Sequence, residues 1–267
     1  MNIGNNIHPS AIIEDGVILG NNITVDAYAI IKNGVKIGDN TSVGAYSLIQ
    51  GNTTIGENNE IFSHASIGSI PQDLKFAGED VELIIGDFNK IREFTLLNPG
   101  TKDGGGKTVI GSKNLLMGYV HVAHDVIIGD NCIFANAVTL AGHINCGDYV
   151  VIGGLTPVHQ FCTIGSHAMV AGASALAQDV PPFCLAEGNR AKLRGLNLNG
   201  LRRRFNNKED INLLKKAYKQ LFASSQCLQD VARELKETSK NVLVLELVEF
   251  VLNTKRGIPL KLKTLEK

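Results

Sequence analysis

Residues 7–44 read IHPSAIIEDGVILGNNITVDAYAIIKNGVKIGDNTSVG. An isoleucine, leucine or valine stands at every sixth position of this stretch, and glycine often follows directly. The spacing continues to Ile67, covers 85–97, and then runs from Ile110 to Leu176. A repeat of fixed length is interpreted first, because it determines the architecture of most of the chain.

A period of six matches neither a helix nor a simple alternating strand, so each unit is a short flat segment followed by a corner. The residue four positions after each aliphatic one is usually small or β-branched, as a tight corner requires. Three units close one triangular coil, and stacked coils pair their strands about 4.8 Å apart. The pattern predicts a mainly β fold, a parallel β-helix. Its left-handedness is expected from similarity to hexapeptide-repeat proteins.

The composition is that of an ordinary globular protein: 267 residues, 44% hydrophobic and 19% charged, with a formal net charge of zero. Zero net charge argues against a general affinity for nucleic acid. The chain shows neither a leader peptide nor an apolar run of the ~18 residues that a membrane span needs. Five cysteines without a Cys-x-x-Cys pair argue for free thiols, and therefore for a cytoplasmic protein.

The repeat divides the chain into two parts. Residues 1–187 are expected to form the β-helix, with the Pro181-Pro182 pair closing its last coil. Two insertions, 68–84 and 98–109, interrupt the repeat, and loops that leave a rigid stack often carry function. Residues 188–267 are expected to form a small helical domain.

The helical character begins at about Lys192. Asn206 or Asn207 is expected to cap a helix that opens at Lys208, and further amphipathic stretches cover 228–235 and 242–252. The segment 188–208 is basic and has no acidic residue; its cations are Arg190, Lys192, Arg194, Arg202, Arg203, Arg204 and Lys208. This charge forms either a solvated face or a site for phosphates or an acidic partner.

Four of the seven histidines fall within one part of the repeat: His121, His124, His143 and His159. His124, Gly142 and Gln160 follow one another at intervals of one coil, so they are expected to stack on one corner about 4.8 Å apart. The remaining histidines, His8, His64 and His167, are expected at the surface.

Three interpretations of this cluster are open from the residues alone. A neutral imidazole can act as a general base, with Asp125 orienting His124 if both lie at a corner and the Gly142 N–H stabilising an oxyanion. Alternatively, the histidines hold zinc in a metal-dependent hydratase similar to the gamma-class carbonic anhydrases. The third interpretation is a set of polar surface imidazoles without catalytic function.

Specific motifs favour the first interpretation. HVAHD at 121–125, LAGH at 140–143 and VHQF at 158–161 closely resemble the UDP-N-acetylglucosamine O-acyltransferases. The resemblance extends over nearly the whole chain, through PQDLK at 71–75, QDVPP at 178–182, EGN at 187–189 and GLRRR at 200–204.

The resemblance implies an acyltransferase of lipid A, and hence lipopolysaccharide, biosynthesis. Such an enzyme moves an R-3-hydroxyacyl group from acyl carrier protein to the glucosamine 3-position of UDP-N-acetylglucosamine or its 3-amino analogue. By similarity, His124 is the general base, Asp125 holds it and the Gly142 N–H stabilises the oxyanion. The attack is direct and needs no metal and no cofactor beyond the phosphopantetheine that the carrier protein brings.

The resemblance also implies binding roles. The sugar–nucleotide cleft would be lined by His121, His143, His159 and Gln160. The neighbouring subunit of a homotrimer would supply Gln72, Asp73 and Lys75. Nucleotide or phosphopantetheine contacts are expected from Asn197, Arg203 and Arg204, and the acyl length would depend on Gly172 and Arg190.

Two departures from the family pattern leave details open. Arg190 stands where family members often carry histidine, which leaves the preferred acyl length open. Pro99 stands where many carry arginine, which leaves the acceptor atom, oxygen or nitrogen, open. A related N-acyltransferase of the same pathway typically has an extra N-terminal domain, for which the repeat beginning at Ile7 leaves no room.

Overall fold

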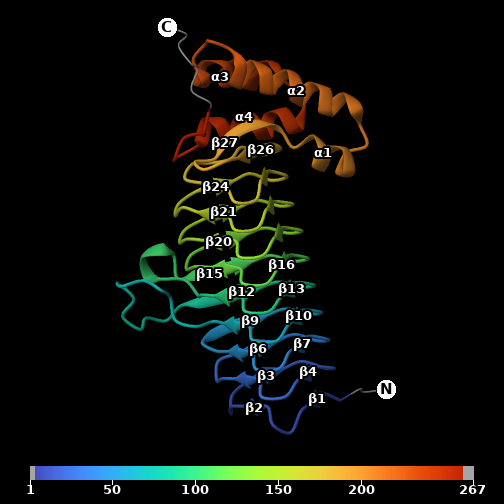
Figure 1. Cartoon of the computed structure of the whole chain (residues 1–267), viewed down its shortest axis with the longest axis vertical. Helices are drawn as coiled ribbons and strands as arrows, with labels where there is room; N and C mark the ends of the chain where they lie inside the picture. Colours follow the sequence, from blue (N-terminus) through green and yellow to red (C-terminus); the bar gives the residue numbers. More distant parts are fainter. Residues whose placement is uncertain (1–3, 261–267) are drawn as a thin grey trace.

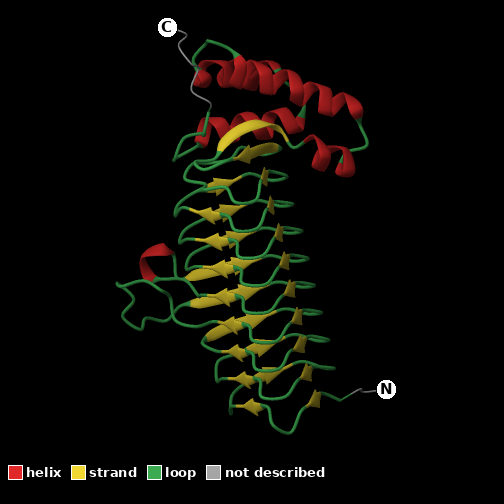
Figure 2. Cartoon of the chain, in the orientation of Figure 1, coloured by secondary structure: helices red, strands yellow, loops and turns green. Residues whose placement is uncertain are grey.

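The computed structural model describes residues 4–260, an elongated stack of short strands with helices at its C-terminal end (Figure 1). The strands form three parallel sheets that rise side by side like the faces of a prism, as the yellow arrows of Figure 2 show. We call them the first, second and third sheets, and name each edge of the prism by the two sheets that meet there.

Up to β25, the strands of each sheet follow one another at every third position of the chain order, and β26 and β27 then extend the first sheet consecutively. The first sheet contains β1 (Asn6–Ile7), β4 (Thr24–Val25), β7 (Ser42–Val43), β10 (Glu60–Ile61), β13 (Lys90–Ile91), β16 (Leu115–Leu116), β19 (Ile133–Phe134), β22 (Val151–Ile152), β25 (Met169–Val170), β26 (Cys184–Glu187) and β27 (Lys192–Leu196). The second contains β2 (Ile12–Ile13), β5 (Ile30–Ile31), β8 (Leu48–Ile49), β11 (Ser66–Ile67), β14 (Leu96–Leu97), β17 (His121–Val122), β20 (Thr139–Leu140) and β23 (Pro157–Val158). The third contains β3 (Ile18–Leu19), β6 (Lys36–Ile37), β9 (Asn52–Ile55), β12 (Glu82–Ile85), β15 (Lys107–Ile110), β18 (Ile127–Ile128), β21 (Asn145–Cys146) and β24 (Thr163–Ile164).

The periodic aliphatic residues point into the prism and form its core. Ile31 and Ile49 are fully buried, and Phe134 and Cys146 occupy equivalent inward positions in later coils. In most coils the residue three positions after the inward one turns the corner with a positive φ, for example 59° at Ala137 after Phe134 and 58° at Tyr149 after Cys146. The predicted left-handed parallel β-helix of hexapeptide repeats is therefore confirmed.

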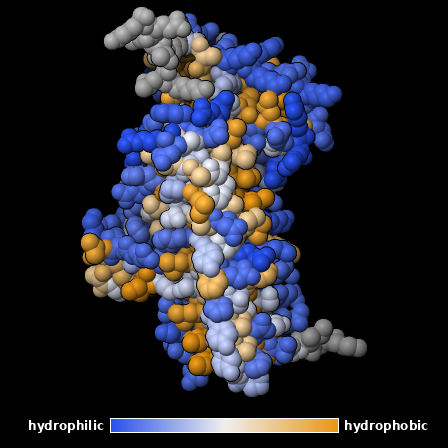
Figure 3. All heavy atoms as spheres, viewed as in Figure 1, coloured by the Kyte–Doolittle hydropathy of each residue, from blue (hydrophilic) through white to orange (hydrophobic). Residues whose placement is uncertain are grey.

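Both insertions leave the prism at the second–third edge. The first lies between β11 and β12, and the second lies between β14 and β15 and contains a 3-10 helix, η1 (Lys102–Gly104). Ile55, Ile85 and Ile110 still pair in register, so neither insertion shifts the coils that follow it. In Figure 1 the two insertions project together from one side of the stack, and Figure 3 shows apolar side chains on that projection.

The C-terminal part covers the open end of the stack with α1 (Leu198–Arg204), α2 (Lys208–Ala223), α3 (Leu228–Thr238) and α4 (Val242–Asn253). The predicted helix start at Lys208 is confirmed, since the Asn207 side chain accepts from the Glu209 N–H at 2.9 Å.

Two expectations about this end are wrong. The stack does not close at Pro181-Pro182, because β26 still pairs in parallel with β25. Residues 192–196 are not helical but form β27, which pairs antiparallel with β26 across the predicted division at 187/188. An unpaired sheet edge exposes hydrogen-bonding groups, and a returning strand together with the helices covers it.

Asp179 fastens the end of the chain to the last coil. Its buried carboxylate accepts from the Thr163 N–H at 2.8 Å, from the Thr254 hydroxyl at 2.6 Å, and from the N–H groups of Lys255 and Arg256 at 3.1 Å. The segment that follows α4 is thereby held against the β-helix. Within residues 4–260, no helix combines the length and apolarity needed to cross a membrane.

Candidate active site

His124 and Asp125 lie at the corner between β17 and β18, on the same edge as the two insertions. Asp125 has a φ of 59°, and its Oδ2 lies 2.8 Å from His124 Nδ1. The corner therefore allows the pairing that two neighbours on a flat strand would not. The Asp125 side chain is 1% exposed and that of His124 13% exposed.

The pairing determines which nitrogen of His124 is free. A carboxylate oxygen only accepts hydrogen bonds, so His124 Nδ1 carries the proton and donates it to Asp125. The lone pair is then on Nε2, which has no hydrogen-bond partner among the described residues. This tautomer is the one that a general base requires.

Asp125 is held by a residue that the sequence analysis missed. The Thr101 N–H donates to Asp125 Oδ1 at 2.8 Å, and the Thr101 hydroxyl donates to Oδ2 at 2.6 Å. The backbone of Gly104 lies against the same carboxyl group, and a Cβ at that position would collide with it. The only feature of the sequence that pointed to these contacts was the Gly-rich composition of the second insertion.

Gly142 stacks on His124, as the register predicted. The His143 N–H donates to the carbonyl of His124, and the Phe161 N–H donates to the carbonyl of Gly142, both at 3.1 Å. A Cβ on Gly142 would lie 2.5 Å from His124 Cε1, so the imidazole occupies the space that a side chain would fill. The Gly142 N–H donates no hydrogen bond to the described residues and remains available.

His143 completes a group of three polar side chains. Its ring stacks on Phe161 with centroids 4.4 Å apart and meets the His124 ring edge-on at 5.1 Å. His143 Nδ1 lies 3.8 Å from Asp125 Oδ2. The potential ligand atoms of His124, Asp125 and His143 lie within 4.8 Å of one another, the one such group of three or more among the described residues.

His121 faces the first insertion through Asn98. The His121 Nε2 lies 3.1 Å from the carboxamide oxygen of Asn98, whose nitrogen donates to the carbonyls of Ser69 at 2.9 Å and Ile70 at 3.1 Å. Burial lowers the pKa of His121, and the neighbouring His124 lowers it further. His121 is thus kept neutral and donates through Nε2.

His159 and Gln160 lie one coil above Gly142 and are exposed. The His159 Nδ1 lies 3.2 Å from the carbonyl of Gln160, to which it can donate. His159 and Arg190 line a common cavity of about 290 Å³ together with Leu176. Arg190, expected to influence the acyl length, therefore lies beside His159, expected in the sugar–nucleotide cleft.

Gln72, Asp73 and Lys75 lie on the projecting first insertion. The carboxylate of Asp73 accepts from the Lys75 N–H at 3.0 Å, and both residues line a small cavity of about 130 Å³ with Thr101. Leu74 between them is fully exposed. Gln72 makes no side-chain hydrogen bond to the described residues, and its carboxamide is exposed.

Asn197, Arg203 and Arg204 lie at a different edge, the third–first. They line a cavity of about 330 Å³ with Tyr149 and His167, and the Arg204 guanidinium lies 4.0 Å from the Tyr149 ring centroid. Asn197 caps α1 by accepting from the Gly200 N–H at 3.1 Å and donates to the His167 carbonyl at 3.0 Å.

His167, expected at the surface, is half-buried there. Its ring is stacked between those of Tyr149 and Phe183. Burial lowers its pKa to about 4, and the positive charge of Arg204 lowers it as well.

Gly172 lies at the first–second edge and is exposed; a Cβ there would lie 3.3 Å from the carbonyl oxygen of Gly154. One chain therefore places the predicted residues on three separate edges. The residues that lie together around the His124 ring are fewer: Asp125, Gly142, His143 and His121.

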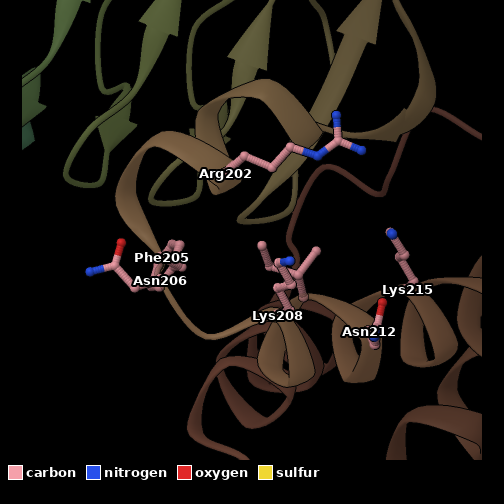
Figure 4. A pocket seen from close by; sticks show the side chains of 7 residues that line it. Arg202, Phe205, Asn206, Lys208, Asn212 and Lys215 are labelled. Carbon is pink, nitrogen blue, oxygen red and sulfur yellow. The ribbon is translucent and has the colours of Figure 1, made fainter.

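The basic segment contributes to a larger cavity between α1 and α2. It has a volume of about 470 Å³ and is lined by Arg202, Phe205, Asn206, Lys208, Ile211, Asn212 and Lys215. Figure 4 shows the three cationic side chains around it, one from α1 and two from α2. The cavity wall contains no acidic residue.

Comparisons with known proteins match both parts of the chain. A model described as UDP N-acetylglucosamine O-acyltransferase, domain 2, covers residues 179–259. A bacterial transferase hexapeptide model of six repeats matches residues 16–51, 34–69 and 107–142.

The chain is 72% identical to an acyl-(acyl-carrier-protein)–UDP-N-acetylglucosamine O-acyltransferase of Aliarcobacter butzleri, over 97% of this chain and 100% of that protein. Among solved structures, it is similar to UDP-N-acetylglucosamine acyltransferase from Campylobacter jejuni, with 46% identity, a TM-score of 0.92 and coverage of 96% and 100% of the two chains. The corresponding enzyme of Francisella novicida is 33% identical, with a TM-score of 0.92 and coverage of 96% and 94%.

Proposed function

The chain belongs to the UDP-N-acetylglucosamine O-acyltransferase family, and from this premise we propose that it transfers an R-3-hydroxyacyl group from acyl carrier protein to the 3-position of the UDP sugar with His124 as general base. The observation that carries the proposal is the unpartnered Nε2 of His124, on a ring whose Nδ1 is bonded to Asp125. The relatives of the chain are named as acyltransferases, and the chain is an acyltransferase of lipid A biosynthesis.

In this mechanism His124 Nε2 removes the proton of the acceptor hydroxyl as its oxygen attacks the thioester carbonyl. The imidazolium that forms is stabilised by the Asp125 carboxylate. The Gly142 N–H donates to the oxyanion of the tetrahedral intermediate, and the glycine leaves room for both the imidazole and the substrate. The proton on His124 then passes to the departing thiolate.

The cysteines support a direct attack without an acyl-enzyme. Cys132, Cys146, Cys162 and Cys184 are buried, and burial raises the pKa of Cys162 to about 11. A thiol with a raised pKa is a poor nucleophile at neutral pH. Cys227, the exposed one, lies on the helical part just before α3.

The proposal includes a homotrimer, because the predicted residues of one chain lie on three different edges. Packing of the second–third edge of one copy against another copy would bring these residues together in one cleft.

A second observation supports assembly. A column of stacked rings, which we call the aromatic column, follows the first–second edge through Tyr28, Tyr46, His64, Phe94 and Tyr119. Tyr28, Tyr46 and Tyr119 are each more than half exposed in the single chain, and such a surface is typical of an interface.

In the trimer, the sugar moiety is proposed to lie against His121, His143, His159 and Gln160. Gln72, Asp73 and Lys75 would reach it from the neighbouring copy, consistent with their place on the projecting first insertion (Figure 1), where Gln72 and Lys75 are exposed and Asp73 is half-buried. Asn197, Arg203 and Arg204 would bind the nucleotide or the phosphopantetheine. Gly172 and Arg190 would bound the acyl chain.

The basic cavity between α1 and α2 is proposed to take the acidic surface of the carrier protein. Guanidinium and ammonium groups without neighbouring carboxylates favour a partner of negative charge. The names of the relatives include the carrier protein as acyl donor.

His124, Asp125 and His143 are also the three potential metal ligands of the hydratase interpretation. A catalytic zinc needs three ligands at about 2.0–2.2 Å and an open position. The Asp125 oxygens already accept from Thr101 and His124, so a metal would have to displace these bonds. The geometry therefore favours the transferase.

The test is a donor panel with purified protein, UDP-N-acetylglucosamine or its 3-amino analogue, and R-3-hydroxyacyl carrier proteins of several chain lengths. We expect product by mass spectrometry from one preferred length, and the product identifies the acceptor atom. His124→Ala is expected to lower turnover at least ~10²-fold, whereas His8→Ala, at a distant exposed histidine, serves as the matched control. Absence of product from every pair, together with stoichiometric zinc, would refute the proposal in favour of the hydratase.

A further inference from the structure

The second insertion returns to the prism and covers the carboxylate that orients the proposed base. Thr101 is 3% exposed, and both of its donors point at Asp125. The mechanism above uses Asp125 only through its bond to His124 and assigns no role to the insertion.

The two donors of Thr101 fix the carboxylate in a single orientation. A carboxyl group otherwise rotates over a broad range about its terminal torsion angle. Here Oδ1 is held by the backbone N–H at 2.8 Å, while Oδ2 accepts both the hydroxyl at 2.6 Å and His124 Nδ1 at 2.8 Å. The oxygen that aligns the imidazole is therefore the one that the Thr101 hydroxyl holds in place.

We infer that Thr101 is a positioning residue for the transfer reaction, whose hydroxyl holds Asp125 Oδ2 so that His124 Nε2 faces the acceptor hydroxyl. The inference rests on the proposed function, since it acts through His124. It assigns a task to the second insertion, which a plain solenoid would not need.

The structure of the insertion explains how Thr101 is presented. The N–H groups of Gly104 and Gly106 donate to the Thr101 carbonyl at 3.0 and 2.8 Å, and Gly105 and Gly106 have φ values of 99° and 79°. The glycines thus close the loop tightly over Asp125, where a side chain at Gly104 would not fit. Asn98, at the start of the same insertion, holds His121 in a similar way.

The first test is Thr101→Val in the full-length protein. Valine preserves the β-branched shape, suits the extended backbone at φ −127° and ψ 157°, and keeps the N–H bond to Asp125. We expect kcat to fall roughly 10- to 100-fold, the effect of removing a hydrogen bond to a charged group, with KM changed less than about twofold. Thr101→Ser restores the hydroxyl and should recover most of the turnover.

Thr108→Val is the matched control. Thr108 is fully buried in β15, the strand into which the same insertion leads, but its hydroxyl has no hydrogen-bond partner among the described residues. The same chemical change there should leave kcat intact. Thr101→Ala provides a second hydroxyl-free variant without added bulk, in case valine prevents folding.

A double-mutant cycle with His124→Ala separates positioning from structural damage. If Thr101 acts through His124, adding Thr101→Val to His124→Ala lowers the residual activity no further. An equal fold loss in both backgrounds, or normal kcat in both hydroxyl-free variants, Thr101→Val and Thr101→Ala, overturns the positioning role and leaves the proposed function standing. Near-normal turnover of His124→Ala instead removes His124 from the role of general base, and Thr101 with it, whereas absence of product from the wild-type protein with every donor overturns the proposed function itself.

Discussion

Replacing Gly142 by alanine tests the contact on which the proposed site depends. The added Cβ would lie 2.5 Å from His124 Cε1 and 2.8 Å from Nε2, whereas carbon atoms in contact normally stay about 3.5–4.0 Å apart. The imidazole must therefore move by about 1 Å or rotate. Either movement disturbs its hydrogen bond to Asp125.

The expected cost follows from this displacement. A misplacement of about 1 Å lowers a catalysed rate by about 10²-fold, so kcat of Gly142→Ala should fall by about that factor. Loss of the His124–Asp125 bond, a hydrogen bond to a charged group with little solvent exposure, should destabilise the fold by ~1.5–3 kcal/mol. Steady-state kinetics and urea unfolding measure the two effects.

The control for this prediction is the same substitution in a protein that lacks the His124 ring. In the His124→Ala background the ring is absent, so Gly142→Ala should destabilise the protein far less than in the wild type. A wild-type kcat in folded Gly142→Ala, or an equal loss of stability with and without the imidazole, would show that the packing of His124 on Gly142 is not as described.

Three further predictions concern other parts of the molecule. Asp179→Ala removes the acceptor of four hydrogen bonds, three from the segment after α4 and one from the last coil, and should lower the free energy of unfolding by ~3 kcal/mol or more in urea titrations; an effect below ~1 kcal/mol would contradict its role in fastening that segment. Tyr46→Ser removes the exposed ring that stacks between Tyr28 and His64 in the aromatic column. Sedimentation at low protein concentration should then show monomers, whereas a persistent trimer would place the interface elsewhere. His167 has a pKa lowered to about 4 against about 6.5 in the unfolded chain, so the unfolded state takes up the proton first and stability falls as pH drops from about 6.5 towards 4. His167→Gln should flatten this part of the stability profile in thermal unfolding, and an unchanged acid slope would refute the assignment.

The sequence was sufficient to predict the β-helix and the stacking of its corner residues. Every coil repeats the same spacing, so His124, Gly142 and Gln160 had to lie on one edge once the period was recognised. Periodicity carries this information over long distances because a change of phase would expose the core aliphatic residues.

The insertions and the covered end of the stack were not predictable in the same way. No period determines the path of residues 98–106, so the bonds from Thr101 to Asp125 and from Asn98 to His121 appeared only in the structure. Likewise, the pairing of β27 with β26 follows from the need to cover an open sheet edge, which the local composition of 192–196 does not reveal.

The stacking of coils makes distance along this molecule a discrete quantity. Adding or removing one whole coil between the His124 corner and the C-terminal helices would move the basic cavity by about 4.8 Å relative to the base, with every inward residue still in phase. In the two insertions, by contrast, the extra residues leave the prism as loops, and Ile55, Ile85 and Ile110 stay in register. If the basic cavity takes the carrier protein, as proposed, the distance from the docked carrier to His124 can change only in steps of one coil. A chain shortened by one coil would then test how far the phosphopantetheine of the carrier can adjust to a different distance.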